Sequence, residues 1–311
     1  MFSQYKHSQN FINQAAAKQP ISCAVAYPCD QSSLEGAVEA AKLGMIKPIL
    51  VGPEQEIKAV AQQHGYDISQ LEIIDMPNSV AAASQAVALV GEGKAHMLMK
   101  GSLHTDELMR EVVSREGGLR TKRRISHVFV MDIPGFETPY FITDAAVNIL
   151  PDLLTKVDII QNAIDLHVAL GLGKPHVAVL SAVETVYSKI PSTLEAAALS
   201  KMVERGQIVG GIVDGPLAMD NALSVEAARI KKVGGTVAGH AQILLAPNIE
   251  AGNMLFKALV FFAKASVAGV ILGAKVPVVL TSRADSATSR LASCAVAALY
   301  GHHLQESKKK V

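Results

Sequence analysis

Four short runs of strand-forming residues between Ser22 and Met99 decide the fold. The runs are SCAVAY (22–27), PILV (48–51), EIID (72–75) and HMLM (96–99). The stretches between them have helical periodicity and cover 33–43, 54–63 and 79–92. The connecting loops are short and carry Gly, Pro, Asp or Asn. Such alternation of strand and helix is typical of βαβ units and predicts a mostly parallel sheet.

The alternation is interrupted once and then resumes. His127–Ile133 and Tyr140–Thr143 flank Pro134 and Gly135, a pair that favours an antiparallel hairpin or paired edge strands. Beyond the hairpin, expected helices at 151–170, 193–204, 224–231, 252–263 and 286–299 alternate with expected strands at 177–181, 208–213, 242–245, 269–271 and 276–280. The chain is therefore predicted to be an α/β protein with αβα layers.

The basic segment from Ser114 to Ser126 is the best boundary between two domains. It contains a Gly117-Gly118 pair that suits a hinge, and five basic residues, Arg115, Arg120, Lys122, Arg123 and Arg124. Two α/β layers joined in this way leave a cleft between them, and such clefts are common ligand sites.

Composition narrows the function class. The chain has 311 residues, of which 50% are hydrophobic and 18% charged, so it can bury a large core. The net charge of +1 gives no reason to expect a nucleic-acid or membrane-surface partner. The three cysteines form no CxxC pair, which fits a reducing compartment. No signal peptide or membrane span is apparent, so we expect a soluble cytoplasmic protein.

The first polar stretch that could carry chemistry is KGSLHTDELMR (100–110). A strand is expected to end at Met99, and a helix is expected to start near Thr105, which resembles an N-cap. Free N–H groups at a helix start favour anions, and Arg110 adds a planar charge that suits phosphate. An ordinary strand–turn–helix joint with a surface arginine explains the same residues.

A second polar stretch, LTSRADS (280–286), also follows an apolar strand and precedes a helix. Its hydroxyls, Arg283 and Asp285 are expected at the carboxyl end of the strand, where open α/β sheets bind ligands. Helix capping by Asp285 or Ser286 is an alternative, but it leaves Ser282 and Arg283 unexplained.

Two further stretches are weaker signals. In IVDGPLAMD (212–220), Asp214 and Asp220 flank a predicted Gly-Pro turn and could ligate a metal or orient other groups, or they could only form the turn and cap a helix. APNIEAGN (246–253) leads into a helix that carries Lys257. No HExxH, GxSxG, Walker A or GxGxxG pattern is present.

Taken together, these stretches resemble the phosphate acetyltransferase/phosphate butyryltransferase family. The resemblance runs from about Lys100 to the C-terminus and is carried, in order, by KGSLHTDELMR, FITDAAVNILPDL, VDGPLAMDNA, APNIEAGNMLFKAL and PVVLTSRADS. The LTSRADS form and the compact length look more like the butyryltransferase branch.

The resemblance implies two α/β domains with a cleft, related to the isocitrate/isopropylmalate dehydrogenase fold. The first would be discontinuous, 1–126 plus 269–311, and the second, 127–268, would form the interface of a homodimer or higher homo-oligomer. The implied reaction converts acyl-CoA and phosphate to acyl phosphate and coenzyme A. Coenzyme A is then a substrate, no cofactor is permanently bound, and the chemical step needs no metal.

The resemblance also implies catalytic residues, for which we formulate a direct ternary-complex transfer. Arg110 and Arg283 would hold phosphate with their guanidinium groups. Ser282 would steady the thiol or the oxyanion, and Asp285 would assist deprotonation of the thiol. In acetyltransferase relatives the assisting Asp lies farther along, at the place of Ser289 here, so Asp285 is the available carboxylate. Further substrate contacts are expected from Lys100, Ser102, His104, Thr105, Asp144, Asp214, Asp220, Asn253 and Lys257.

Two other functions compete with this one. The first is a metal- and NAD-dependent decarboxylating dehydrogenase on the same fold, for which Asp214 and Asp220 are the only hint. The second is a non-catalytic acyl-CoA or phosphate sensor, against which the retained Ser282, Arg283 and Arg110 argue. The segment Arg115–Arg124 is either a contact for the phosphates of coenzyme A or a solvated face.

Overall fold

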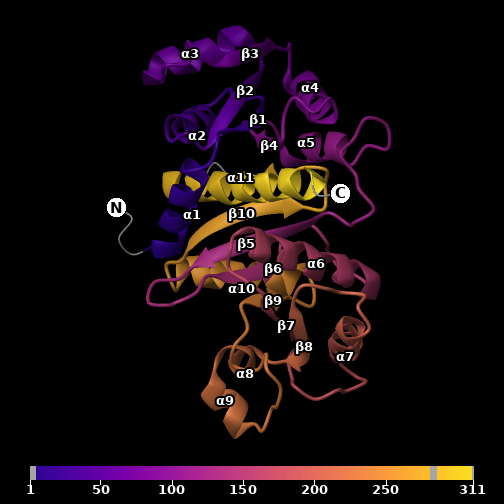
Figure 1. Cartoon of the computed structure of the whole chain (residues 1–311). Helices are drawn as coiled ribbons and strands as arrows, with labels where there is room; N and C mark the ends of the chain where they lie inside the picture. The colour runs from indigo at the N-terminus through magenta and orange to yellow at the C-terminus, as the bar shows by residue number, and fades with distance from the viewer. Residues whose placement is uncertain (1–4, 281–285, 310–311) are drawn as a thin grey trace. The chain divides into compact units, whose positions relative to one another are not determined.

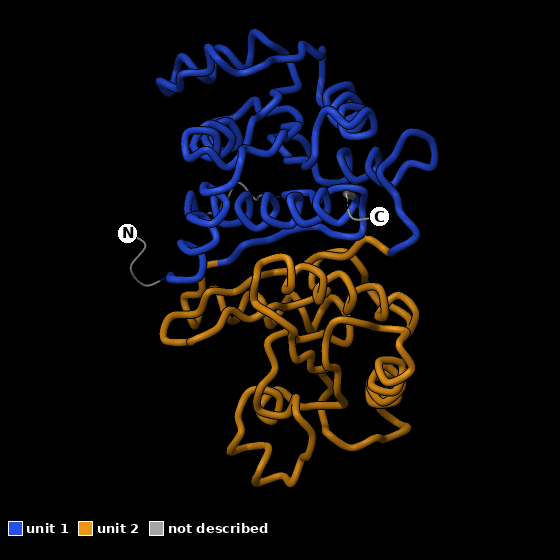
Figure 2. The backbone as a smooth tube through the Cα atoms, in the orientation of Figure 1, with its two compact units in different colours: residues 1–123, 267–311 blue, residues 124–266 orange. Residues whose placement is uncertain are grey.

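Residues 5–280 and 286–309 are described by the computed structural model, and the chain divides into two units (Figure 2). Unit 1 comprises Met1–Arg123 and Val267–Val311, and unit 2 comprises Arg124–Ser266. The domains expected from the sequence, 1–126 with 269–311 and 127–268, have limits near these. That each unit behaves as an independent domain stays a prediction.

Unit 1 contains a sheet in the order β3-β2-β1-β4-β11-β10. Its strands are β1 (Ile21–Ala26), β2 (Ile46–Gly52), β3 (Glu72–Asp75), β4 (Met97–Lys100), β10 (Ser266–Leu272) and β11 (Val278–Val279). Neighbouring strands pair in parallel except β10, which is antiparallel to β11. Cys23, Ala24, Val25 and Ala26 of β1 are fully buried, as in a central strand covered on both faces.

Some helices of unit 1 begin at side-chain caps that the sequence provides. They are α1 (Lys6–Ala16), α2 (Gln31–Lys42), α3 (Glu54–His64), α4 (Ser79–Gly91), α5 (Thr105–Val112) and α11 (Ala287–Lys309). Asp30 and Asn78 each accept a hydrogen bond from the third following N–H and so start α2 and α4. Helix α1, which the sequence analysis did not predict, packs against α11, so early and late parts of the chain lie side by side (Figure 1).

Unit 2 contains a sheet in the order β5-β6-β9-β7-β8. Its strands are β5 (Ser126–Asp132), β6 (Tyr140–Thr143), β7 (His176–Leu180), β8 (Ile212–Leu217) and β9 (Ile243–Leu245), and its helices are α6 (Leu153–Ala169), α7 (Pro191–Glu204), α8 (Met219–Leu223), α9 (Val225–Ile230) and α10 (Ile249–Phe261). The β5–β6 pair is antiparallel, which confirms the predicted hairpin, and the other pairs are parallel.

The prediction of a turn at Gly215-Pro216 was wrong, because both residues lie inside β8. This strand pairs only with β7 and forms the edge of the sheet, where a proline removes no ladder hydrogen bond. A Cβ at Gly215 would lie 2.7 Å from the carbonyl oxygen of Val179 and 3.2 Å from Cβ of Ala196. Glycine therefore allows β8 to approach both β7 and α7.

The α/β class and the mostly parallel strand arrangement are confirmed by these pairings. Within the part of the chain that the structure describes, no helix is both long enough and apolar enough to cross a bilayer.

Candidate active site

The loop that follows β4 packs directly against the loop that follows β1. The Gly101 N–H donates to the carbonyl of Ala26 at 2.8 Å, and the Ser102 N–H donates to the carbonyl of Tyr27 at 2.8 Å. A Cβ at Gly101 would overlap both carbonyl oxygens, so only glycine allows this approach. The loop beginning at Gly101 is therefore fixed at the carboxyl edge of the unit 1 sheet, beside the start of α2.

Ser102 and Lys100 both bind backbone groups around this loop. Ser102 Oγ donates to Tyr27 O at 2.9 Å and accepts from the Cys29 N–H at 3.3 Å. Lys100 is only 9% exposed, and its Nζ donates to two loop carbonyls at 2.9 and 3.2 Å. The lysine thus places a positive charge beneath the loop, which favours an anion nearby. Direct substrate contact by either side chain stays a prediction.

Cys29 lies at the same edge but is not prepared to act as a nucleophile. Burial raises the pKa of its thiol to about 12, and the neighbouring Glu56 carboxylate adds to this rise. The thiolate is the reactive form of cysteine, and this shift disfavours the thiolate of Cys29 at neutral pH. This protonation state favours a direct acyl transfer over one through an acyl-cysteine.

Helix α5 begins at Thr105, so its N-cap lies one residue earlier than predicted. His104 is the N-cap, and its N–H donates to Glu107 Oε2 at 3.3 Å, while Thr105 is the first helical residue. The first turn contains Asp106 and Glu107, whose negative charges oppose binding of an anion at this helix start. Arg110 lies in the last turn of α5 and is exposed, so it is available for a ligand.

Ser282, Arg283 and Asp285 lie outside the described residues. Strand β11, which precedes them in the chain, is described. Its pairing shows at which edge of the sheet the described chain ends before these residues. Val278 and Val279 of β11 pair in parallel with Leu98 and Met99 of β4. Both strands therefore end at the same edge of the sheet. From this edge the chain continues after β4 into the loop that begins at Gly101, here called the Lys100 loop, and after β11 into the segment that follows Leu280.

In unit 2, the buried Asp144 organises a turn. Its carboxylate accepts hydrogen bonds from the backbone N–H groups of Ala146, Val147 and Asn148, at 2.9, 3.1 and 3.2 Å. The Asn148 side chain adds a fourth at 2.6 Å. Asn253 in α10 donates to the carbonyl of Ala145 at 3.2 Å, so two of the family stretches meet here. The four bonds of Asp144 account for its burial without a substrate.

Asp214 and Asp220 bind different partners. Asp214 is half-buried, which raises the pKa of its carboxyl group, and it accepts from the Gly215 N–H at 2.8 Å. Asp220 is exposed and forms an ion pair with Lys231 at 2.9 Å. Among residues 5–280 and 286–309, no group of three or more His, Cys, Asp or Glu side chains could hold a metal ion. Lys257 is exposed on α10, and its predicted substrate contact stays a prediction.

The basic segment expected to be a hinge is attached to unit 1 over much of its length. The Lys275 N–H donates to the carbonyl of Leu119 at 2.8 Å, and Thr121 Oγ1 donates to the carbonyl of Gly273 at 2.7 Å. A Cβ at Gly118 would overlap the Ser114 carbonyl, so this glycine serves a tight turn. Contact with coenzyme A by this segment stays a prediction.

Sequence reasoning missed a buried histidine beside Asp144. His127 in β5 is 4% exposed, and the centroid of its ring lies 4.2 Å from the ring centroid of Phe129. Thr143 Oγ1 donates a hydrogen bond to the His127 carbonyl at 2.9 Å. Burial lowers the pKa of His127 to about 4, although the Asp144 carboxylate opposes this shift. The available signal was a histidine within a run of apolar strand residues.

Comparison with known proteins decides the family. The protein-family model described as Phosphate acetyl/butaryl transferase matches residues 78–298 of this chain. A phosphate acetyltransferase of Rhizobium meliloti is 64% identical over 289 residues, which cover 93% of this chain and 92% of that protein. The chain belongs to this family. The prediction made from the five stretches is confirmed.

Other relatives and solved structures agree with this assignment. A phosphate butyryltransferase of Clostridium acetobutylicum is 45% identical over 94% of this chain and 98% of that protein, so identity does not favour the butyryltransferase branch. A branched-chain phosphotransacylase from Enterococcus faecalis is 33% identical, with a TM-score of 0.79 over 91% of this chain and 99% of that one. A 4-hydroxythreonine-4-phosphate dehydrogenase from Burkholderia phymatum shares the fold alone. It is 14% identical, with a TM-score of 0.57 over 91% of this chain and 98% of that one. The isocitrate/isopropylmalate dehydrogenase comparison stays a prediction.

Family membership makes this chain an acyltransferase. It moves a short acyl group reversibly between coenzyme A and inorganic phosphate, with coenzyme A as a substrate. The dehydrogenase and sensor alternatives are not favoured by these relatives. That the chemical step needs no metal stays a prediction.

The buried His127 predicts a loss of stability in mild acid. Its pKa is about 4 in the folded chain and near 6.5 when unfolded, so between these values only the unfolded chain takes up the proton. The contribution of His127 to the free energy of unfolding is constant above pH 6.5. It falls by on the order of 3 kcal/mol as the pH drops from 6.5 to 4. We expect urea unfolding midpoints to decrease from pH 7 to pH 5, and His127→Phe to reduce that decrease.

The exposed His240 provides the matched control. His240→Gln should keep the pH dependence of the wild type. An unchanged pH dependence in His127→Phe would show that other groups cause the acid sensitivity.

Proposed function

We propose that the acyl group is acetyl and that transfer occurs directly within a ternary complex. A phosphate oxygen attacks the carbonyl carbon of acetyl-CoA, the C–S bond breaks, and the sulfur leaves with the electron pair and takes up the phosphate proton. The products are acetyl phosphate and coenzyme A. The 64% identity to a protein named phosphate acetyltransferase supports acetyl, and the protonated Cys29 supports a transfer without an acyl-cysteine.

The observation that carries this proposal is the shared edge of β4 and β11. The parallel pairing of these strands means that the Lys100 loop and the segment after Leu280 follow from neighbouring strand ends. In this arrangement Arg110 and Arg283 hold the phosphate, and Ser282 steadies the oxyanion or the leaving sulfur. Asp285 carries the proton between the two groups: in the reverse reaction it accepts the thiol proton and passes it to the departing phosphate, and in the forward reaction it passes the phosphate proton to the sulfur.

The first experiment measures thiol release from acetyl-, propionyl-, butyryl- and isobutyryl-CoA, with and without phosphate and with no metal added. We expect phosphate-dependent release that is fastest with acetyl-CoA. A preference for butyryl- or isobutyryl-CoA would contradict the choice of acetyl and keep the acyltransferase. Since one methylene group is worth about 1–3 kcal/mol in a pocket, the preferred chain should exceed its neighbours by roughly tenfold or more.

Arg110→Gln tests the phosphate contact. Loss of a charge-assisted hydrogen bond worth about 1.5–3 kcal/mol should raise the KM for phosphate by roughly tenfold or more. The exposed Arg205 at the end of α7 is the control, and Arg205→Gln should leave the KM within about twofold. An unchanged KM for phosphate in Arg110→Gln would contradict a phosphate contact by Arg110.

Asp285→Asn tests the proposed base. A near-normal rate of reverse transfer, from acetyl phosphate to coenzyme A, would contradict that role of Asp285.

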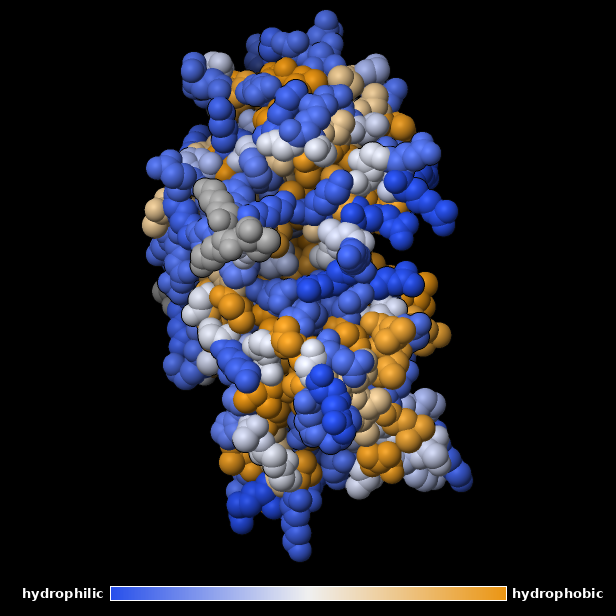
Figure 3. All heavy atoms as spheres, turned by 45° about the vertical axis from the view of Figure 1, so that its right-hand side comes forward, coloured by the Kyte–Doolittle hydropathy of each residue, from blue (hydrophilic) through white to orange (hydrophobic). Residues whose placement is uncertain are grey.

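We also propose that the chain is a cytoplasmic homodimer whose second domain, unit 2, forms the interface. Unit 2 exposes large apolar side chains around the start of α6 and on α10 and its C-cap, and exposed apolar surface of this kind marks protein interfaces. The most exposed are Ile149, Leu150, Leu154, Met254, Phe261 and Phe262. Figure 3 shows hydrophobic residues, in orange, gathered in places on one face of the molecule. The free thiols of Cys23, Cys29 and Cys294 support a reducing compartment.

Light scattering tests the dimer. We expect the wild type to have twice the chain mass of 32.9 kDa. The double variant Leu150→Glu/Phe262→Glu should be a monomer, because charges at these positions would be buried in the interface. Val80→Glu, at an exposed apolar position of α4 in unit 1, is the control and should remain a dimer. A monomeric wild type would refute the proposal.

A further inference from the structure

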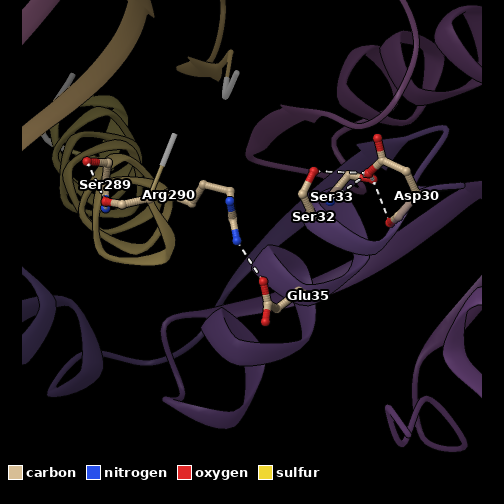
Figure 4. A network of polar contacts seen from close by, with 7 residues as sticks. Asp30, Ser32, Ser33, Glu35, Ser289 and Arg290 are labelled. Atoms are coloured by element: carbon tan, nitrogen blue, oxygen red, sulfur yellow. Dashed lines mark hydrogen bonds and ion pairs between the residues drawn. The ribbon is translucent and has the colours of Figure 1, made fainter. Parts of the chain in front are cut away.

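A charged contact joins α2 to the first turns of α11. One guanidinium nitrogen of Arg290 lies 2.6 Å from Glu35 Oε2, and the Arg290 side chain is only 10% exposed (Figure 4). A Cβ at Gly36 would lie 3.8 Å from the Arg290 side chain, so the arginine stem runs across the surface of α2. Removing Glu35 would leave a buried charge without this carboxylate, which is the costly way to break such a pair.

The start of α11 is also attached to β10. Ser293 Oγ accepts from the Gly269 N–H at 3.0 Å and donates to the Ser289 carbonyl at 2.8 Å. Ser286 Oγ accepts from the Ser289 N–H at 3.1 Å, as an N-cap does. The helix that follows residues 281–285 is thus held to β10 by hydrogen bonds and to α2 by the Glu35–Arg290 ion pair.

The beginning of α2 is attached to the other half of the candidate site. Asp30 caps α2 by accepting from the Ser33 N–H at 2.8 Å. The residue before this cap, Cys29, donates its N–H to Ser102 Oγ in the loop after β4. The residue before the α2 N-cap therefore contacts Ser102 in the loop after β4, and Glu35, just beyond the first turn of α2, contacts Arg290. The start of α2 thus links the loop after β4 to the start of α11.

We propose that Glu35 and Arg290 are positioning residues for acyl transfer. This inference rests on the proposed function, because it takes Arg110 and the Ser282–Arg283 pair as the groups that act on phosphate and the acyl carbon. The ion pair fixes α11, into which the Ser282–Arg283 segment leads, relative to the loop that leads to Arg110. Neither residue needs to contact substrate. Small displacements of reacting groups cost large factors in rate, so a loosened α11 should lower the turnover number.

Glu35→Gln tests the role, with Glu39→Gln as the matched control. Glu39 lies one turn further along α2 and forms an exposed ion pair with Lys42 at 2.8 Å. We expect Glu35→Gln to lower kcat for phosphate-dependent thiol release from acetyl-CoA at least tenfold, with the KM for acetyl-CoA changed less than threefold. Glu39→Gln should change neither value by more than twofold. Wild-type kcat in Glu35→Gln would overturn the inference.

A second variant separates positioning from stability. Glu35→Gln/Arg290→Met removes the buried charge as well, so its thermal midpoint should recover toward that of the wild type while kcat stays low. Recovery of kcat together with the midpoint would show a purely structural role and overturn the inference. A wild type without phosphate-dependent thiol release would refute the proposed function itself, whereas an active wild type with an unaffected Glu35→Gln refutes only the positioning role.

Discussion

The candidate site depends on a contact between two backbones that leaves no room for a side chain. Gly101 and Ser102 donate their N–H groups to the carbonyls of Ala26 and Tyr27, and this closes the gap between the ends of β1 and β4. The Ser102 hydroxyl donates to the same Tyr27 carbonyl, and the Lys100 ammonium donates to the carbonyls of Gly101 and Leu103. Because the polar backbone groups are satisfied within the loops, the edge of the sheet is fixed before any ligand binds.

Several polar residues of the loops and helix starts bind backbone groups rather than reach into solvent. Asp144 binds three consecutive N–H groups, and Asp30 and Ser286 cap helices. A carboxylate that accepts several backbone N–H groups fixes the path of the chain, so such residues preserve the shape of a loop. The exposed Arg110 is different, since a guanidinium without a structural duty can respond to an anion. The polar residues of these loops thus serve loop construction as well as chemistry.

The sequence predicts the alternation of strands and helices well, because each buried strand is a short apolar run bounded by turn residues. It also predicts the β5–β6 hairpin from Pro134 and Gly135. It fails where tertiary context decides: α1 is stabilised by packing on α11, which lies at the opposite end of the sequence. The Gly-Pro pair of β8 has the composition of a turn, but an edge strand accommodates it. The burial of His127 and Asp144 follows from contacts between separate elements, which periodicity alone does not report.

The discontinuous path of unit 1 has a consequence for synthesis on the ribosome. Strand β4 is synthesised early, but β11, the neighbour that covers its free edge, follows only after the whole of unit 2. Unit 2 is contiguous, so its residues are complete before those of β11 appear. A nascent chain therefore carries an uncovered edge of the unit 1 sheet until β11 has been synthesised. Exposed edges of this kind invite mispairing, so this protein should depend on chaperones that shelter incomplete chains.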